Sequence, residues 1–266
     1  MSIADKLTTI AENEQKVYDA GFEAGKSQGG DTDAAFEEGK QAQYDEFWDT
    51  FQNNGKLRNY KQVFSGRGWK SEVFYPKYNI IVTGAMGIFQ EFGGTVPFSL
   101  TERLEKCGVT LDFSGLTSVM TNAFLGVIFT EIPHIDGSKV TGWSSTFQSS
   151  QFLETISIAI KEDGSATWSS TFGGCKALKS LTITSGTIGK NGFNVKDSTK
   201  LSKASILSIL NACKKDVIGQ GISITLPSKC IDGATDTETL MSETGDADLY
   251  GALMAARSYG YSVTFA

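Results

Sequence analysis

The chain has 266 residues, of which 40% are hydrophobic and 20% are charged, so it is long enough to bury a substantial core. Its formal net charge of −6 argues against a nucleic-acid-binding protein, which would normally carry a basic surface. Its 4 cysteines are scattered and it has 1 histidine, so we expect neither a zinc site nor any other cofactor.

The N-terminal residues 1–6 carry no basic segment followed by an apolar run, so they do not indicate a secretory signal. No stretch approaches the ~18 consecutive apolar residues that span a bilayer. We therefore expect a protein that is made in a cytoplasm and is not inserted into a membrane.

Residues 1–55 are expected to form a helical segment for oligomerisation and attachment. Ile3, Leu7, Ile10 and Val17 lie on one coiled-coil seam with alternating spacings of 4 and 3 residues, and Glu14 fills the remaining core position of the seam. Isolated helices of this length are marginal in water, so the seam indicates that copies of the chain associate. The alternative is a helical hairpin that packs on its own domain.

Residues 56–110 have no clear period, although 78–82 is typical of a strand. We interpret this segment as an adaptor, or as the atypical first turn that caps the array that follows.

Residues 111–200 contain repeats. The pentapeptide Trp-Ser-Ser-Thr-Phe occurs at 143–147 and again at 168–172, and each copy is followed by an apolar ladder. The ladders consist of Leu153, Ile156 and Ile158 in the first copy and Leu178, Leu181 and Ile183 in the second. Phe124, Phe147, Phe172 and Phe193 mark successive turns at intervals of 23, 25 and 21 residues. A period of about 20–25 residues with an L-x-x-L-x-L core is typical of a leucine-rich solenoid.

The ladder residues alternate with polar residues, as they do in a strand that is buried on one face. Thr155, Ser157, Thr182 and Thr184 therefore belong on the face opposite the ladders.

Residues 201–266 break the repeat and predict the order helix, strand, helix, strand, which we interpret as a C-terminal cap that extends the same sheet. The predicted fold class is thus α+β. It combines an N-terminal α-helical, coiled-coil-like stalk, a leucine-rich-repeat β-solenoid head and a helix–strand C-terminal cap.

Three segments resemble known proteins. Phe172 to Leu181 resembles the A-F-x-x-C-x-x-L-x-x-L core of BspA-like leucine-rich repeats, with Ser150 standing where the family has cysteine one turn earlier. The opening residues 3–21 and the closing residues 201–265 are similar to those of tail-region proteins of phages and prophages of gut Gram-positive bacteria. The resemblance implies a virion protein of the distal tail or baseplate, assembled in the cytoplasm of the bacterial host. It supplies no catalytic residues.

Trp143 and Trp168 are the candidate ligand-binding pair. Either they fill one repeated core position, or they are exposed aromatic faces for sugar rings, with Ser145 and Ser170 supplying hydrogen bonds. Exposed indoles would favour a receptor-binding protein, and buried indoles would favour a structural one.

The sequence indicates a non-enzymatic protein. His134 has no partners for a catalytic or metal site within its motif, and the acidic residues between 115 and 195 are too sparse to indicate a sugar-cleaving groove. We expect a homotrimeric phage or prophage tail protein that also contacts other tail or baseplate proteins. Its repeat head would bind a polysaccharide or protein of the host surface. The alternatives are a structural baseplate or tail-fibre connector that binds only virion proteins, and a bacterial surface adhesin.

Overall fold

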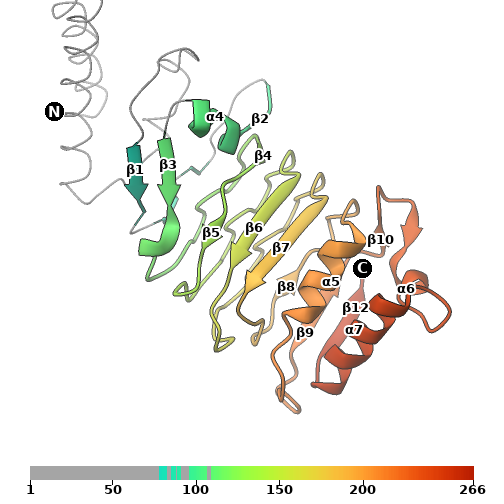
Figure 1. Ribbon diagram of the computed structural model, residues 1–266. Coiled ribbons are helices and arrows are strands. Elements are labelled where there is room, and N and C mark those ends of the chain that lie inside the picture. Colours follow the sequence, from blue (N-terminus) through green and yellow to red (C-terminus); the bar gives the residue numbers. More distant parts are fainter. Residues whose placement is uncertain (1–77, 83–84, 88, 91–95, 107–108) are drawn as a thin grey trace, which may run out of the picture.

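The computed structural model describes residues 78–82, 85–87, 89–90, 96–106 and 109–266 (Figure 1). The expected helical segment, with Ile3, Leu7, Ile10 and Val17, lies outside the described residues. Its role in oligomerisation therefore stays a prediction.

The main sheet has five strands that pair in parallel throughout. They are β2 (Phe98–Ser99), β4 (Phe129–Glu131), β5 (Ile135–Asp136), β6 (Thr155–Ala159) and β7 (Ser180–Ser185). Both β4 and β5 pair with β6, and the three residues between them include Pro133, which has no N–H to donate to a ladder. One strand of the sheet is thus split into two short pieces.

A smaller unit lies within residues 78–115, and β2 of the main sheet comes before its helix along the chain. It consists of β1 (Tyr78–Ile81), α4 (Leu100–Lys106), β3 (Val109–Asp112) and the short 3₁₀ helix η1 (Phe113–Gly115), and β1 pairs in parallel with β3. Asp112 begins the 3₁₀ helix by accepting a hydrogen bond from the backbone N–H of Ser114.

The core contains a column of phenylalanine rings. The ring centroids of Phe89 and Phe124 are 5.1 Å apart, those of Phe124 and Phe147 are 5.7 Å apart, and those of Phe147 and Phe172 are 5.4 Å apart. Phe193 continues the column at 5.6 Å with a tilted ring. The predicted recurrence of phenylalanine is confirmed, because each successive turn places its ring on the one before.

Backbone hydrogen bonds join the stacked turns opposite the sheet. The N–H groups of Met120, Asn122 and Phe124 donate to carbonyl groups of residues 142–146, and those of Trp143, Ser145 and Phe147 donate to carbonyl groups of residues 167–171. The same bends recur in each turn, because left-handed φ angles occur at Asn122, Ser145 and Ser170 and again at Gly126, Ser149 and Gly174. The backbone therefore repeats although the residue types do not.

The C-terminal part begins with helix α5 (Lys203–Asn211), which lies beside β7. A second parallel sheet follows in the spatial order β12 (Ser262–Phe265), β9 (Ser223–Leu226) and β8 (Phe193–Asn194). The remaining elements are the hairpin of β10 (Lys229–Cys230) and β11 (Thr235–Asp236), the short helix α6 (Thr237–Leu240) and helix α7 (Ala247–Ser258), which packs against α5.

The predicted fold class is wrong. The described residues form a mixed α/β structure with a parallel half-barrel sheet and few helices, in place of the predicted α+β leucine-rich-repeat solenoid head, and the predicted stalk lies outside them. The longest helix among the described elements, α7, has 12 residues. The C-terminal strands also do not extend the main sheet. Helix α5 covers the edge of β7, so β9 and β12 pair with β8 in a sheet of their own.

Candidate functional site

The outward side of β6 and β7 forms a surface of hydroxyl groups, which we call the hydroxyl face. It consists of Thr155, Ser157, Ser180, Thr182 and Thr184. The pairing register places Thr155 beside Ser180 and Ser157 beside Thr182, so equivalent hydroxyl groups stand in rows across the two strands. Residues between them, such as Ile156 and Leu181, point into the core. The predicted alternation of the two strands is therefore confirmed.

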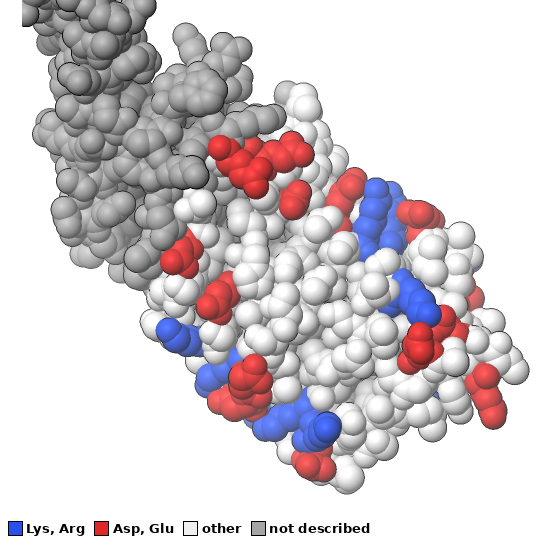
Figure 2. All heavy atoms as spheres, viewed as in Figure 1, with Lys and Arg blue, Asp and Glu red and all other residues white. Residues whose placement is uncertain are grey.

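Charged side chains lie around this surface, and its centre is uncharged (Figure 2). The ammonium group of Lys179 lies 3.1 Å from a carboxylate oxygen of Glu154, with both side chains close to half exposed. The Ser99 hydroxyl group donates to Glu131 at 3.2 Å. Exposed ion pairs such as Lys179–Glu154 contribute little to stability, so each of the two charges stays available to a charged group of a partner.

His134 borders the hydroxyl face and is exposed. Its Nδ1 lies 3.0 Å from the Ser157 hydroxyl oxygen, which is within hydrogen-bond distance. A nucleophilic serine also needs a third group that orients the imidazole, and within the described residues no carboxylate hydrogen bond to His134 accompanies this contact. The nearby Asp136 is engaged elsewhere, because hydrogen bonds from the side chain and the N–H of Ser138 hold the pKa of its carboxyl group below the ordinary value.

The three cysteines in the described part of the chain are buried, as expected for small hydrophobic residues. Burial raises the pKa of the Cys175 thiol to about 12, and its Sγ donates to the carbonyl oxygen of Phe147 at 3.0 Å. A thiol held neutral in this way is a poor nucleophile.

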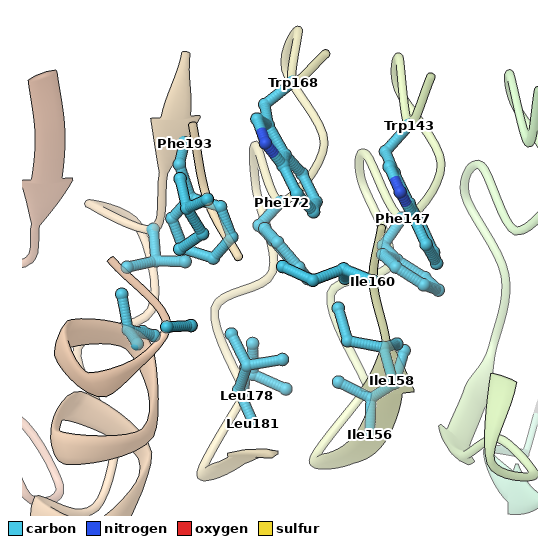
Figure 3. Packing of buried hydrophobic residues seen from close by; sticks show 14 of the residues in the cluster. Trp143, Phe147, Ile156, Ile158, Ile160, Trp168, Phe172, Leu178, Leu181 and Phe193 are labelled. Atoms are coloured by element: carbon cyan, nitrogen blue, oxygen red, sulfur yellow. The ribbon is translucent and has the colours of Figure 1, made fainter. Parts of the chain in front are cut away.

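Trp143 and Trp168 are buried, with 0% and 3% of their surface exposed, so of the two alternatives the structure shows the repeated core position and not the exposed aromatic faces. Their rings stack on each other at 5.7 Å with an interplanar angle of 11° (Figure 3). Trp168 also meets the ring of Phe193 edge-on at 4.9 Å. The repeated pentapeptide thus places its tryptophans in a core column, beside the phenylalanine column.

Both indole N–H groups are buried without a hydrogen-bond acceptor among the described residues. The backbone of Gly137 lies against the Trp143 ring, since a Cβ atom on this glycine would fall 2.3 Å from Cζ2. Contacts with the Trp168 ring and with the Gly137 backbone therefore fix the indole of Trp143, at the cost of an unpaired donor.

The predicted partners Ser145 and Ser170 occupy equivalent bends, with φ angles of 51° and 53°. Ser170 is exposed and Ser145 is half-buried, and both belong to the stacked bends and not to the hydroxyl face. The structure therefore separates the four residues of the predicted ligand site into a buried pair and two surface bends. The alternation in 155–158 and 181–184 did predict the common face of Thr155, Ser157, Thr182 and Thr184, but the predicted ligand site did not include these residues.

Comparisons with known proteins add no assignment: no family model, no curated protein and no solved structure matches the chain. None of the helices in the described part of the chain combines the length and the apolar character needed to cross a bilayer. No group of three or more histidine, cysteine or acidic side chains within the described ranges could hold a metal ion.

Proposed function

We propose that the chain is a non-enzymatic structural protein of a phage or prophage tail, and that it binds a neighbouring virion protein through the hydroxyl face. The observation that carries the proposal is the uncharged patch of Thr155, Ser157, Thr182 and Thr184 on a parallel sheet whose other face is core. A rigid backbone presents these groups without a folding cost on binding. The resemblance of residues 3–21 and 201–265 to tail-region proteins supports the tail assignment.

The burial of both tryptophans favours a protein partner over a sugar. Sugar-binding surfaces commonly use exposed aromatic rings as apolar platforms, and the hydroxyl face contains none. Rows of hydroxyl groups are suited to direct and water-mediated hydrogen bonds with a polar protein surface. The flanking Glu154–Lys179 pair adds one charge of each sign at the rim of the patch.

The test is incorporation into particles. Particles are induced and purified from the strain that encodes the chain, and the copies per particle are counted by quantitative mass spectrometry. We expect Thr182→Glu to reduce incorporation by about tenfold or more, because it places an unpaired charge within a desolvated contact. Ser169→Glu is the matched control, since Ser169 is also exposed but lies on the stacked bends, and it should be incorporated normally. Absence of the wild-type chain from particles would contradict the tail assignment, and normal incorporation of Thr182→Glu would contradict the use of this face.

A host-receptor function is the second candidate, and the uncharged, hydroxyl-rich centre of the same face is the observation in its favour. Such a face could hydrogen-bond a neutral polysaccharide, and several copies in one particle would strengthen a weak contact. Binding of the fluorescently labelled full chain to host cells distinguishes the candidates. Saturable binding that Thr182→Glu abolishes and Ser169→Glu retains would favour the receptor function.

A further inference from the structure

The second sheet ends in a strand with a free edge. The N–H groups of Ser262 and Ala266 donate to Ile222 and Leu226 of the neighbouring segment, so these residues face β9. In a parallel ladder the alternate residues face the other way, which directs the N–H and C=O groups of Val263 and Phe265 outward. No described strand pairs with β12 on that side.

The other sheet has its corresponding edge covered. The backbone N–H of Leu181 donates to the Ser205 hydroxyl group at 2.9 Å, and that of Ile183 donates to the Ser208 hydroxyl group at 2.8 Å. Helix α5 thus supplies two acceptors at the edge of β7. Helix α7, which contacts β12, has no hydrogen bond of this kind to the strand within the described part of the chain.

The outer edge of β12 also lacks the features that normally prevent pairing. Strands at sheet edges commonly carry a lysine, a proline or a bulge, which discourage contact with another chain. The segment Ser262-Val263-Thr264-Phe265 has none of these, and its central residues have high β-propensity. Ser262 and Thr264 are exposed, and no charge lies on the strand itself.

We propose that β12 pairs in an antiparallel manner with β12 of a second copy of this chain, about a two-fold axis at Thr264. This register places Val263 opposite Phe265 of the second copy and uses each of the outward backbone groups in four hydrogen bonds. Thr264 then meets its own equivalent at a site without backbone hydrogen bonds, where side chains approach closely and two threonines pair favourably. A second copy fits this edge because the two-fold register pairs all of its outward backbone groups, and because the strand carries no charge that would oppose the same charge of its equivalent.

The contact is weak. A four-residue strand pair buries far less than the roughly 1,000 Å² that a stable interface needs. The pairing is therefore concentration-dependent and gains strength where copies are held close together. This inference does not depend on the proposed function, and it uses a surface distinct from both the hydroxyl face and residues 1–55.

The test is directed disulfide formation in the full chain. In the proposed register the two Thr264 Cα atoms are about 4.5 Å apart, which is within the range that a disulfide spans. In Thr264→Cys, oxidised glutathione exchanges with the two introduced thiols to give one intermolecular disulfide and two reduced glutathione molecules. Ser169→Cys is the control, because that residue is exposed but lies away from the edge. We expect dimer crosslinking of Thr264→Cys to be at least about tenfold faster than that of Ser169→Cys.

Sedimentation equilibrium provides a second readout. The mass of the wild-type full chain should rise reversibly with concentration toward twice that of its smallest species, and Thr264→Lys should abolish the rise by opposing two like charges. Ser169→Lys should leave it unchanged. Equal crosslinking rates for the two cysteine variants, or a wild-type mass that is constant with concentration, would overturn the proposal. Crosslinking of Thr264→Cys only to a different protein, in particles that contain the chain, would assign the edge to another partner and also overturn it.

Discussion

Ser149 occupies a backbone position that the neighbouring turns fill with glycine. Its φ angle is 61°, and the equivalent Gly126 and Gly174 have φ angles of 63° and 77°. A left-handed conformation costs a residue with a Cβ atom roughly 1–2 kcal/mol, whereas glycine loses roughly 0.5–1 kcal/mol more conformational freedom on folding. Glycine is therefore the better residue at this bend.

We predict that Ser149→Gly raises the free energy of unfolding by about 0.5–1 kcal/mol, measured by urea denaturation. A substitution that removes glycine from the equivalent bend of the next turn provides the control. A Cβ atom at Gly174 would lie 3.4 Å from the nearest atom, so Gly174→Ala meets no steric overlap and should lower stability through its φ angle alone. A destabilised Ser149→Gly variant would contradict the assignment of strain to this bend.

Gly137 illustrates a different requirement, which is space beside the Trp143 ring. A Cβ atom there would fall 2.3 Å from the indole and 2.8 Å from the carbonyl oxygen of Ala159, and neither group can move without disturbing the stack. We predict that Gly137→Ala lowers the free energy of unfolding by roughly 1–3 kcal/mol or more. A Cβ atom at Gly251 in α7 would meet no other atom within 4 Å, so Gly251→Ala should instead stabilise the protein by about 0.5–1 kcal/mol. If both variants unfold at the same urea concentration, the packing argument is wrong.

At the scale of the element, α5 is the structural reason that the main sheet ends at β7. Ser205 is 3% exposed and accepts a hydrogen bond from the Leu181 N–H, and its own hydroxyl group donates to the Lys179 carbonyl oxygen at 3.2 Å. Removal of this hydroxyl group would leave a buried N–H without an acceptor. Ser208 makes a similar bond to Ile183 in a less buried place, where water can substitute.

We predict that Ser205→Ala lowers the free energy of unfolding by about 1–3 kcal/mol, and that Ser208→Ala has a smaller effect. Amide hydrogen exchange gives the specific readout. The Leu181 amide should lose protection in Ser205→Ala by more than the global destabilisation explains, and the Ile183 amide should do so in Ser208→Ala. If either variant instead loses protection uniformly across β7, the separate hydrogen bonds from Leu181 and Ile183 to α5 do not protect this edge.

The elements also show which features could be predicted from the sequence. The spacing of Phe124, Phe147 and Phe172 predicted the register, because each turn repeats one strand and one ring. The separate C-terminal sheet was not predictable in this way, since it depends on α5 and on the hydroxyl groups of Ser205 and Ser208, which the repeat period does not reveal. The burial of Trp143 and Trp168 was left open because two serines follow each residue, and serines occur both in exposed sites and in left-handed bends.

At the scale of the whole molecule, three buried weak acids lie in the repeated core and in the C-terminal part. They are the thiols of Cys175 and Cys213 and the hydroxyl group of Tyr261. Burial raises the pKa of the Cys213 thiol to about 12, as it does for Cys175. It also raises the pKa of Tyr261 to about 12, with a further contribution from Cys213. Tyr261 accepts a hydrogen bond from the Lys214 N–H at 2.9 Å and donates to the Ile188 carbonyl oxygen, so it ties the start of β12 to residues 188 and 214.

These shifts predict that the protein loses stability in alkaline solution. The ordinary pKa is 9.0 for each thiol and 10.0 for the tyrosine, and folding raises all three, so the folded state binds protons more tightly than the unfolded state. The associated stability is fully present below about pH 9 and is lost as the pH rises toward 12. At pH 10.5 each buried thiol can account for up to roughly 2 kcal/mol of the loss.

Urea denaturation at pH 7.5 and pH 10.5, at equal ionic strength, measures this loss. Lysines also titrate in this range, so the comparison of variants is decisive. We expect Cys175→Ala/Cys213→Ala to be less stable than wild type at pH 7.5, because two buried groups are shortened, yet to lose less stability between the two pH values. An equal loss in the variant and in the wild type would mean that the thiols ionise as readily in the folded protein as in the unfolded chain. Water would then reach both thiolates in the folded protein, although the cysteines are buried.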